Sequence, residues 1–300
     1  MDLLIVGSIA FDSVETPEGK VDDALGGTAV FSSVAASLFS PVNLVAIVGD
    51  DFGKENLEFL EARGIDLEGV EQTRGKTFRW ACRYLDDMNR RETISTELNV
   101  FADFDPRLPE RYRMSDYVLL ANIQPSLQLK VLDQIKNPKF IACDTIDLWI
   151  ETAREELEEV LGRSQLLVIN DEEARLLTGE TQVPRAARRL LKKHGLEIVV
   201  VKRGEHGATL FSHEGIFVAP AYPLEEVIDP TGAGDSFAGA MAGKLAEMRD
   251  LSLEAMKRAM VYGVVVSSFT VEDFSLNRLR RLSSEEIETR YAQIREMTGF

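Results

Sequence analysis

The chain has 300 residues, which is enough for one large α/β domain or two smaller ones. Its 34 lysines and arginines and 50 aspartates and glutamates give a net charge of −16, so its surface repels nucleic acid and anionic membranes. A ligand that carries phosphate must therefore be held locally, by backbone N–H groups, a few cations or a metal ion.

Cysteine usage and apolar patterning indicate a protein of the cytoplasm. Cys82 and Cys143 lie far apart and form no disulfide or metal-binding pattern, so both are expected in the core. The chain begins directly with the strand-like run LLIVG, and no apolar run is long enough to cross a bilayer. We expect neither a membrane nor a nucleic-acid partner.

Short apolar runs alternate with amphipathic stretches along most of the chain. Strands are predicted at residues 3–6, 43–48, 117–121, 139–143, 166–169 and 197–201, and helices at residues 54–63, 127–135, 151–161 and 184–194. This alternation favours an α/β fold with a doubly wound, mostly parallel sheet that is covered on both faces. Ligands of such sheets bind beyond the carboxyl ends of the strands.

Two segments depart from this alternation and are predicted to form β-hairpins, residues 11–25 with a turn at 17–19 and residues 76–101 with a turn at 86–89. In the second hairpin one face carries Phe78, Trp80, Cys82 and Tyr84. An isolated hairpin is marginally stable, so the two are expected to pair into a small β-sheet that acts as a lid. An antiparallel extension of the core is the alternative.

The segment DPTGAGDSFAG, residues 229–239, carries the strongest chemical signal. Apolar residues at helical spacing follow it, so Gly232, Ala233 and Gly234 lie at a helix N-terminus, where free N–H groups bind anions. A carboxylate repels bound phosphate, so a loop that only binds phosphate would avoid one. The presence of Asp235 therefore favours a role as general base, which accepts the proton of an attacking hydroxyl. The alternative is that Asp235 only complements the helix dipole and the glycines only pack.

This segment resembles the D-x-T-G-A-G-D-x-F signature of the PfkB, or ribokinase-like, family of carbohydrate and nucleoside kinases. Other matches follow in the order that the family has: VGSIAFD at the N-terminus, Gly26-Gly27, VGDDFG at 48–53, NDEE at 170–173 and VVVKRGEHG at 199–207. The resemblance covers nearly the whole chain and implies a single ribokinase-like kinase domain over residues 1–300.

The resemblance also implies roles for residues, with ATP and Mg²⁺ as cofactors. Asp235 is the catalytic base, and Gly232, Ala233 and Gly234 form the anion hole for the transferring phosphoryl group. Asn170 and Glu173 organise Mg²⁺ and its waters, and Asp229 is a candidate ligand of a monovalent cation such as K⁺. Asp12, Gly26 and Gly27 would bind substrate hydroxyls. The residues implied to bind the nucleotide are Asn170, Lys202, Gly204, Thr231, Gly232, Gly234, Val265, Ser268 and Asn277. Lys202 is equally compatible with a surface position.

Departures from the family pattern concern the substrate. Phe31 stands where sugar kinases of the family usually have an asparagine, Asn122 where a glutamate or other polar residue often follows the strand, and Leu148 where many members have an arginine. An aromatic wall at Phe11 and Phe31 would suit a nucleobase, although Phe31 also fits the core.

We therefore expect an ATP-dependent phosphotransferase that acts on a hydroxyl, preferably primary, of a small sugar or sugar-like substrate. The alternatives are a nucleoside kinase of the same fold and a non-catalytic homologue that binds nucleotide or sugar. A dinucleotide-dependent oxidoreductase is disfavoured, because the first turn lacks G-x-G-x-x-G. The apolar face of the lid is expected to serve a homodimer.

Overall fold

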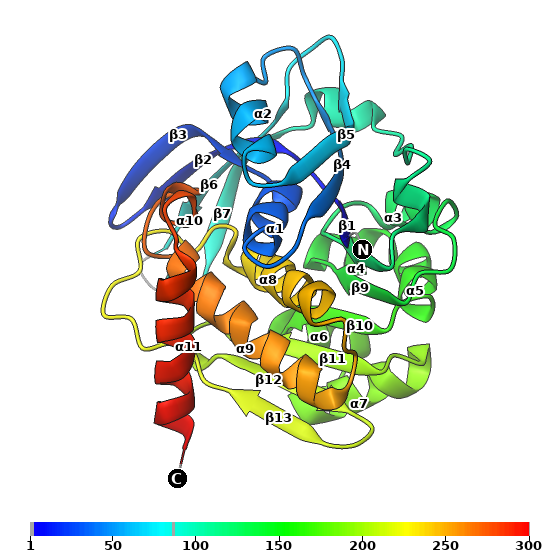
Figure 1. Ribbon diagram of the computed structural model, residues 1–300, viewed down its shortest axis with the longest axis vertical. Coiled ribbons are helices and arrows are strands. Elements are labelled where there is room, and N and C mark those ends of the chain that lie inside the picture. Colours follow the sequence, from blue (N-terminus) through cyan, green and yellow to red (C-terminus); the bar gives the residue numbers. More distant parts are fainter. Residues whose placement is uncertain (1–2, 86–87, 300) are drawn as a thin grey trace.

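The computed structural model describes residues 3–85 and 88–299. Within these residues the larger sheet has nine strands in the order β13-β12-β11-β10-β9-β8-β1-β4-β5 (Figure 1). All neighbours from β5 to β11 run parallel, and β12 and β13 add an antiparallel edge. The strands are β1 (Leu3–Val6), β4 (Val42–Val48), β5 (Ile65–Gln72), β8 (Tyr117–Leu120), β9 (Phe140–Asp144), β10 (Leu166–Asn170), β11 (Ile198–Lys202), β12 (Ala208–Ser212) and β13 (Ile216–Ala219).

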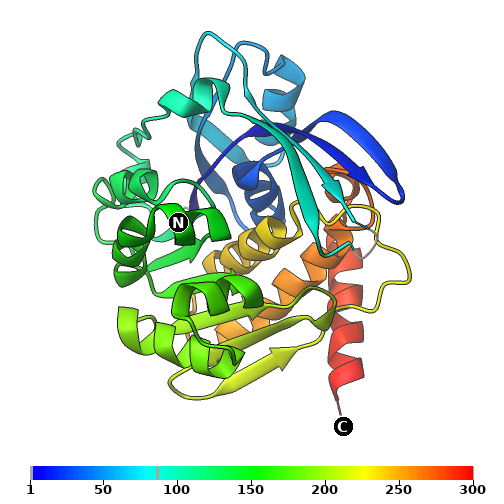
Figure 2. The ribbon, with the colours of Figure 1, turned by 180° about the vertical axis from the view of Figure 1, so that it is seen from behind.

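Helices cover both faces of this sheet, which confirms the predicted doubly wound α/β fold (Figures 1 and 2). One face packs against α1 (Thr28–Ala36), α2 (Lys54–Glu61), α8 (Ala233–Met248), α9 (Leu253–Thr270), α10 (Asn277–Arg280) and α11 (Ser284–Thr298). The other packs against α3 (Pro125–Leu132), α4 (Asp147–Thr152), α5 (Arg154–Gly162), α6 (Asp171–Thr178) and α7 (Val183–His194). Short 3-10 turns are η1 (Asn99–Asp103), η2 (Tyr112–Met114) and η3 (Gly204–His206).

Helices α1 and α8 pack against each other at close range, and small residues make this possible. A Cβ at Gly239 of α8 would overlap the backbone of Ser32, and a Cβ at Gly243 would lie 2.6 Å from the carbonyl oxygen of Ala36. Ser32 Oγ also donates a hydrogen bond to the carbonyl oxygen of Asp235 at 3.1 Å. This contact fixes the N-terminus of α8 relative to α1.

The two predicted hairpins pair into one separate four-stranded sheet in the order β3-β2-β6-β7. Its strands are β2 (Ala10–Thr16), β3 (Gly19–Gly26), β6 (Phe78–Tyr84) and β7 (Arg91–Glu97), and β2 joins β6 in parallel. The predicted small sheet is thus confirmed; of its second turn, residues 86 and 87 lie outside the described residues. We call this sheet the lid.

The structure corrects two expectations. The helix predicted over residues 151–161 is two helices, α4 and α5, which meet at Ala153 with φ −140°; nothing in the local sequence explains the break. The face of the lid that carries Cys82 and Tyr84 is turned inward, where both side chains are buried with Val14. None of the described helices has the length and apolar character needed to cross a membrane.

Candidate active site

Polar residues end three neighbouring strands of the larger sheet. Asp144 is the last residue of β9, Asn170 of β10 and Lys202 of β11. Because these strands are parallel, their carboxyl ends lie at one edge, where α/β sheets bind ligands. The N-terminus of α8 meets the same place, since Lys202 Nζ would lie 2.9 Å from a Cβ at Gly234.

The loop before α8 requires glycine at Gly232 for two reasons. Its φ of +75° lies in the left-handed region, and a Cβ there would overlap the ring of Phe31. The loop is braced from the other side by Asp229, whose Oδ1 accepts a hydrogen bond from the Thr231 N–H at 2.8 Å. In the first turn of α8 the Ala233 N–H donates to the Pro230 carbonyl oxygen at 3.2 Å, whereas the Gly234 N–H, which has no partner among the described residues, is presented at the edge of the sheet.

Asp235 lies in the first turn of α8 and is partly buried. Burial, together with the nearby charge of Asp144, raises the pKa of Asp235 to about 7, while Lys202 and Arg91 act in the opposite direction. A general base is most effective when its pKa lies near the working pH. The environment of Asp235 thus suits proton acceptance at neutral pH.

Lys202 is buried among acidic groups. Its Nζ lies 3.4 Å from Asp144 Oδ1, and the exposed fractions of the two side chains are 19% and 6%. Burial alone would lower the pKa of Lys202, but the charges of Asp144, Glu173 and Asp235 outweigh it and raise the pKa above its ordinary value. Lys202 is therefore a fixed cation beside the N-terminus of α8, and the alternative of a surface position is wrong.

Asn170 and Glu173 form a capping box at the start of α6. Asn170 Oδ1 accepts the Glu173 N–H at 2.8 Å, and Glu173 Oε2 accepts the Asn170 N–H at 2.9 Å. Burial raises the pKa of Glu173 to about 7, with Lys202 opposing the shift. The motif N-x-x-E thus has a structural role, and Glu173 Oε1 accepts no hydrogen bond from any residue that the structure describes.

This donor set fits a magnesium ion that is held through water and phosphate. In the described part of the chain, no group of three or more His, Cys, Asp or Glu side chains is placed to hold a metal directly. Mg²⁺ usually keeps several waters and takes one or two carboxylates plus substrate phosphates. Glu173 Oε1 and the neighbouring Asp144 are the carboxylate oxygens available for that purpose.

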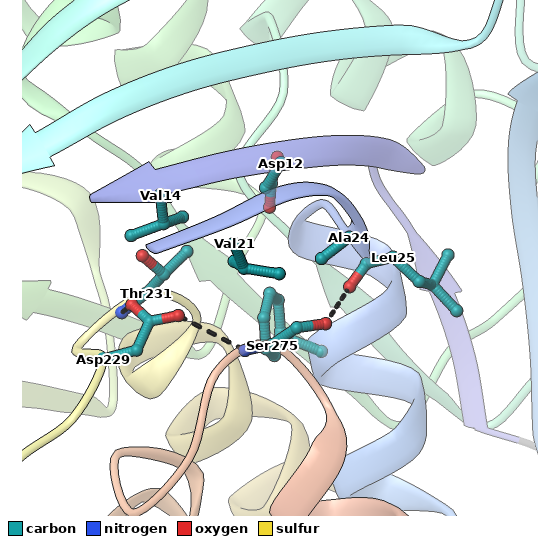
Figure 3. Close-up of a pocket in the computed structure, with 9 residues that line it drawn as sticks. Asp12, Val14, Val21, Ala24, Leu25, Asp229, Thr231 and Ser275 are labelled. Carbon is teal, nitrogen blue, oxygen red and sulfur yellow. Dashed lines mark hydrogen bonds between the residues drawn. The ribbon is translucent and has the colours of Figure 1, made fainter. Parts of the chain in front are cut away.

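On the acceptor side, Asp12 faces the two glycines that precede α1. Its Oδ2 accepts the Gly27 N–H at 3.2 Å, and a Cβ at Gly26 would overlap the same carboxylate. Burial raises the pKa of Asp12 to about 7, and the charges of Asp235 and Asp229 add to the rise. A narrow crevice opens beside it (Figure 3), lined by Asp12, Val14, Val21, Ala24, Leu25, Phe31, Asp229, Thr231 and Ser275.

Sequence reasoning missed two residues that organise this region. Ser275 donates its N–H to Asp229 Oδ2 at 3.3 Å and its hydroxyl to the carbonyl oxygen of Leu25 at 2.6 Å, which ties the lid to the loop before α8 (Figure 3). Trp149 Nε1 donates to Asn122 Oδ1 at 2.7 Å and so orients the amide of Asn122. Neither contact has a local sequence signal, because the partners lie far apart in the chain.

The predicted nucleotide residues are only partly brought together. Gly204 and Thr231 lie next to the lid, at Asn89 and Tyr84 respectively. Val265 is fully buried in the core and presents no surface to a ligand, so its prediction as an adenine contact is corrected. The two remaining predicted adenine residues are used within the protein: the Ser268 hydroxyl donates to the Val265 carbonyl oxygen, and Asn277 donates to Asp273.

Comparison with known proteins places this arrangement in a family. The profile of the pfkB family carbohydrate kinases matches residues 2–279. The chain is similar to a cytidine kinase of Thermococcus kodakarensis, at 33% identity over 80% of this chain and 86% of the other, and to a nucleoside kinase of Methanothermobacter thermautotrophicus, at 29% identity over 91% and 90%. A putative ribokinase II of E. coli in complex with ATP and Mg²⁺ has the same fold, with a TM-score of 0.79 at 22% identity over 97% of this chain and 99% of the other. The chain therefore belongs to the pfkB family of carbohydrate kinases and is a phosphotransferase that acts on a hydroxyl group.

Proposed function

We propose that this ATP-dependent sugar or nucleoside kinase acts on the primary hydroxyl of a nucleoside. The observation that carries this choice is the lining of the narrow crevice beside Asp12, where one buried carboxylate stands among Val14, Val21, Leu25 and Phe31. Val14 and Phe31 are each 1% exposed, so these apolar side chains would face an acceptor only after the lid opens. A free sugar is polar on all sides, whereas a nucleoside joins a polar ribose to a flat base that buries well against such side chains. The likeness to two nucleoside-type kinases supports the same choice.

In the proposed mechanism, Asp235 accepts the proton of the acceptor hydroxyl while the hydroxyl oxygen bonds to the γ-phosphorus of ATP. The bond from that phosphorus to the bridging oxygen of ADP breaks at the same time, so ADP leaves with the electron pair. The N–H groups of Gly232, Ala233 and Gly234 would stabilise the charge on the transferring group, although the Ala233 N–H donates to the Pro230 carbonyl oxygen in this structure. Lys202 adds a positive charge beside them.

Two further groups hold the reactants. Mg²⁺, when bound, supplies charge neutralisation for the phosphates, and Glu173 Oε1 would hold one of its waters. Asp12, fixed by the Gly27 N–H, would accept hydrogen bonds from ribose hydroxyls. The amide of Asn122, oriented by Trp149, is a second candidate for such a contact.

The lid would keep water out of the site during transfer. It contacts the body through the hydrogen bond from the Thr16 hydroxyl to the Ile228 carbonyl oxygen at 2.9 Å, the contact between Tyr84 and Thr231 at 3.4 Å and the ion pair of Arg79 with Asp51 at 2.8 Å, among others. Opening for substrate would break such contacts, and closure would restore them. Water exclusion directs the phosphoryl group to the acceptor instead of to solvent.

Two finer expectations stay predictions. Asp229 would hold a monovalent cation such as K⁺, although both of its carboxylate oxygens already accept backbone N–H groups, from Thr231 and Ser275. The homodimer loses part of its original argument, because Cys82 and Tyr84 on the aromatic face of the lid are buried within the lid and Tyr84 also contacts Thr231 of the body. What remains for a dimer is the exposed edge strand β7, where Ile94 is 60% exposed. Sedimentation at high concentration decides the oligomeric state.

The decisive experiment is ADP release from Mg-ATP across a panel of nucleosides, free sugars and sugar phosphates. We expect a signal that depends on a nucleoside and is lost in Asp235→Asn. Saturation by a free sugar and not by nucleosides would overturn the choice of acceptor, while the assignment as a kinase would stand. A flat panel beside clear ATP binding would favour the non-catalytic alternative.

A further inference from the structure

An arginine on the lid lies close to the place where phosphate is expected. Arg91 is the first residue of β7 and pairs with Tyr84 of β6 across the antiparallel ladder. Such cross-strand partners share one face of a sheet, and Tyr84 is buried on the inner face. The Tyr84 hydroxyl lies 3.4 Å from Thr231 Oγ1, in the loop that leads to the anion hole. Arg91 is thus carried on the side of the lid that faces the site.

A second contact places the same hairpin over the other loop of the site. A Cβ at Gly204 would lie 3.4 Å from Asn89 Oδ1, and Gly204 follows Lys202 by two residues. The hairpin of β6 and β7 therefore touches both loops that flank the N-terminus of α8, through Tyr84 on one side and Asn89 on the other. Arg91 follows both contacts in the chain, two residues beyond Asn89. The hairpin that carries it is drawn in cyan in Figure 2.

The environment of Arg91 leaves its charge available. Its guanidinium lies over the ring of Trp80, 5.6 Å from the centroid, and among the described residues no carboxylate forms an ion pair with it. The whole of β7 is exposed. Its positive charge nevertheless reaches the site, because it acts to lower the pKa of Asp235 and of Tyr84. The chain as a whole is strongly acidic, so a cation without a carboxylate partner among residues 3–85 and 88–299 is a specific feature of this place.

We propose that Arg91 binds the γ-phosphate of bound ATP from the lid and is a catalytic residue of the phosphoryl transfer. The proposal rests on the proposed kinase mechanism and adds a second cation to Lys202. The planar guanidinium suits phosphate oxygens, and the stack on Trp80 preorganises it. Because Arg91 moves with the lid, the cation that stabilises the transferring group would be complete only when the lid is closed and water is excluded.

The test compares two nucleotides that differ by the γ-phosphate. Binding of Mg²⁺-ADP and of Mg²⁺-adenylyl imidodiphosphate, a non-hydrolysable ATP analogue, is measured by calorimetry for the wild type, Arg91→Gln and Arg91→Lys. We expect Arg91→Gln to weaken the analogue roughly 10- to 100-fold and ADP less than about 2-fold, since a hydrogen bond to a charged group is lost only in the first case. Arg91→Lys, which keeps the charge, should restore part of the loss.

Arg83→Gln is the matched control. Arg83 lies on β6 of the same hairpin, pairs with Glu15 at 3.0 Å and does not face the site. Its replacement therefore removes an equal charge from the lid at a place away from the site. We expect both nucleotides to bind this variant as they bind the wild type. A loss in Arg91→Gln that is equal for the two nucleotides would mean a merely structural role, and no loss at all would also overturn the proposal.

The same titrations separate this proposal from the proposed function. If the wild type binds neither nucleotide, the kinase assignment fails and the role of Arg91 fails with it. If the wild type binds both and Arg91→Gln does not discriminate between them, only the role of Arg91 fails. In the supporting case, turnover of Arg91→Gln with an active acceptor falls by on the order of 10- to 1000-fold, because the contact is made to the transferring group.

Discussion

Lys202 Nζ lies 3.4 Å from Asp144 Oδ1, and the two groups end β11 and β9 with only β10 between them. Glu173 and Asp235 complete an acidic surround that keeps the lysine charged. A cation at the N-terminus of α8 is therefore in place before any nucleotide arrives. Such preorganisation matters for catalysis, because no reorganisation is then needed when charge develops in the transition state.

The pair predicts an asymmetric response to mutation. Lys202→Met leaves Asp144 buried without its partner and should lower the free energy of unfolding by about 3–5 kcal/mol. The double variant Lys202→Met/Asp144→Leu removes both charges and should recover most of this loss, since an apolar pair of similar volume replaces a buried ion pair at little cost. Urea unfolding of the three proteins gives the comparison. A double variant that is less stable than Lys202→Met would contradict the ion-pair interpretation.

Glu173 offers a way to separate a structural role from a metal role. Glu173→Gln keeps the capping box, because a glutamine side chain can still accept the Asn170 N–H, whereas Glu173→Ala removes it and should cost about 1 kcal/mol. Only the charge differs between Glu173→Gln and the wild type. We expect Glu173→Gln to unfold nearly like the wild type in urea at about pH 5, below the raised pKa of Glu173, and to gain stability on the wild type at higher pH. It should also need a several-fold higher Mg²⁺ concentration for half-maximal turnover. An unchanged Mg²⁺ requirement would leave the motif as a helix cap alone.

The pH dependence of turnover tests Asp235 as the base. Its pKa is raised to about 7, and a base works only in its deprotonated form, so kcat/KM should fall tenfold per pH unit as the pH drops below about 7. Asp235→Asn should lose turnover by orders of magnitude with ATP binding nearly unchanged, because only proton acceptance is removed. Wild-type turnover in this variant would show that another group takes the proton.

Local patterns predicted the central strands of the larger sheet, the lid strands and the helix N-terminus after Gly232, because apolar runs and turn residues are encoded by neighbouring residues. They did not predict β5, β12 or β13. Other features depend on the folded chain. Ser275 meets Asp229 and Trp149 meets Asn122 only after distant segments come together. Phe31 illustrates the same limit: its ring packs beneath Gly232 with 1% exposure, as the core alternative predicted, and its role as an aromatic wall for a substrate stays a prediction.

Asp12 predicts how stability changes with pH. Its pKa in the folded protein is about 7, against 3.8 for an ordinary aspartate, so between these values the folded state binds the proton more tightly than the unfolded state. The contribution of this carboxyl to the free energy of unfolding therefore decreases as the pH rises from about 4 to 7. Asp12→Asn binds no proton and has no such slope, while its amide oxygen can still accept the Gly27 N–H.

The variant should accordingly gain on the wild type as the pH rises. One pKa unit corresponds to about 1.4 kcal/mol, so the advantage of Asp12→Asn in urea unfolding should grow by about 2–3 kcal/mol between pH 5 and pH 8. Asp22→Asn, which changes an exposed carboxylate of the same hairpin, is the matched control and should show little change over this range. If the Asp12 difference were flat, or decreased with pH, the carboxylate would be ionised in the folded protein at pH 5. The carboxylate would then accept hydrogen bonds from substrate hydroxyls without first paying the free energy of ionising a buried carboxyl.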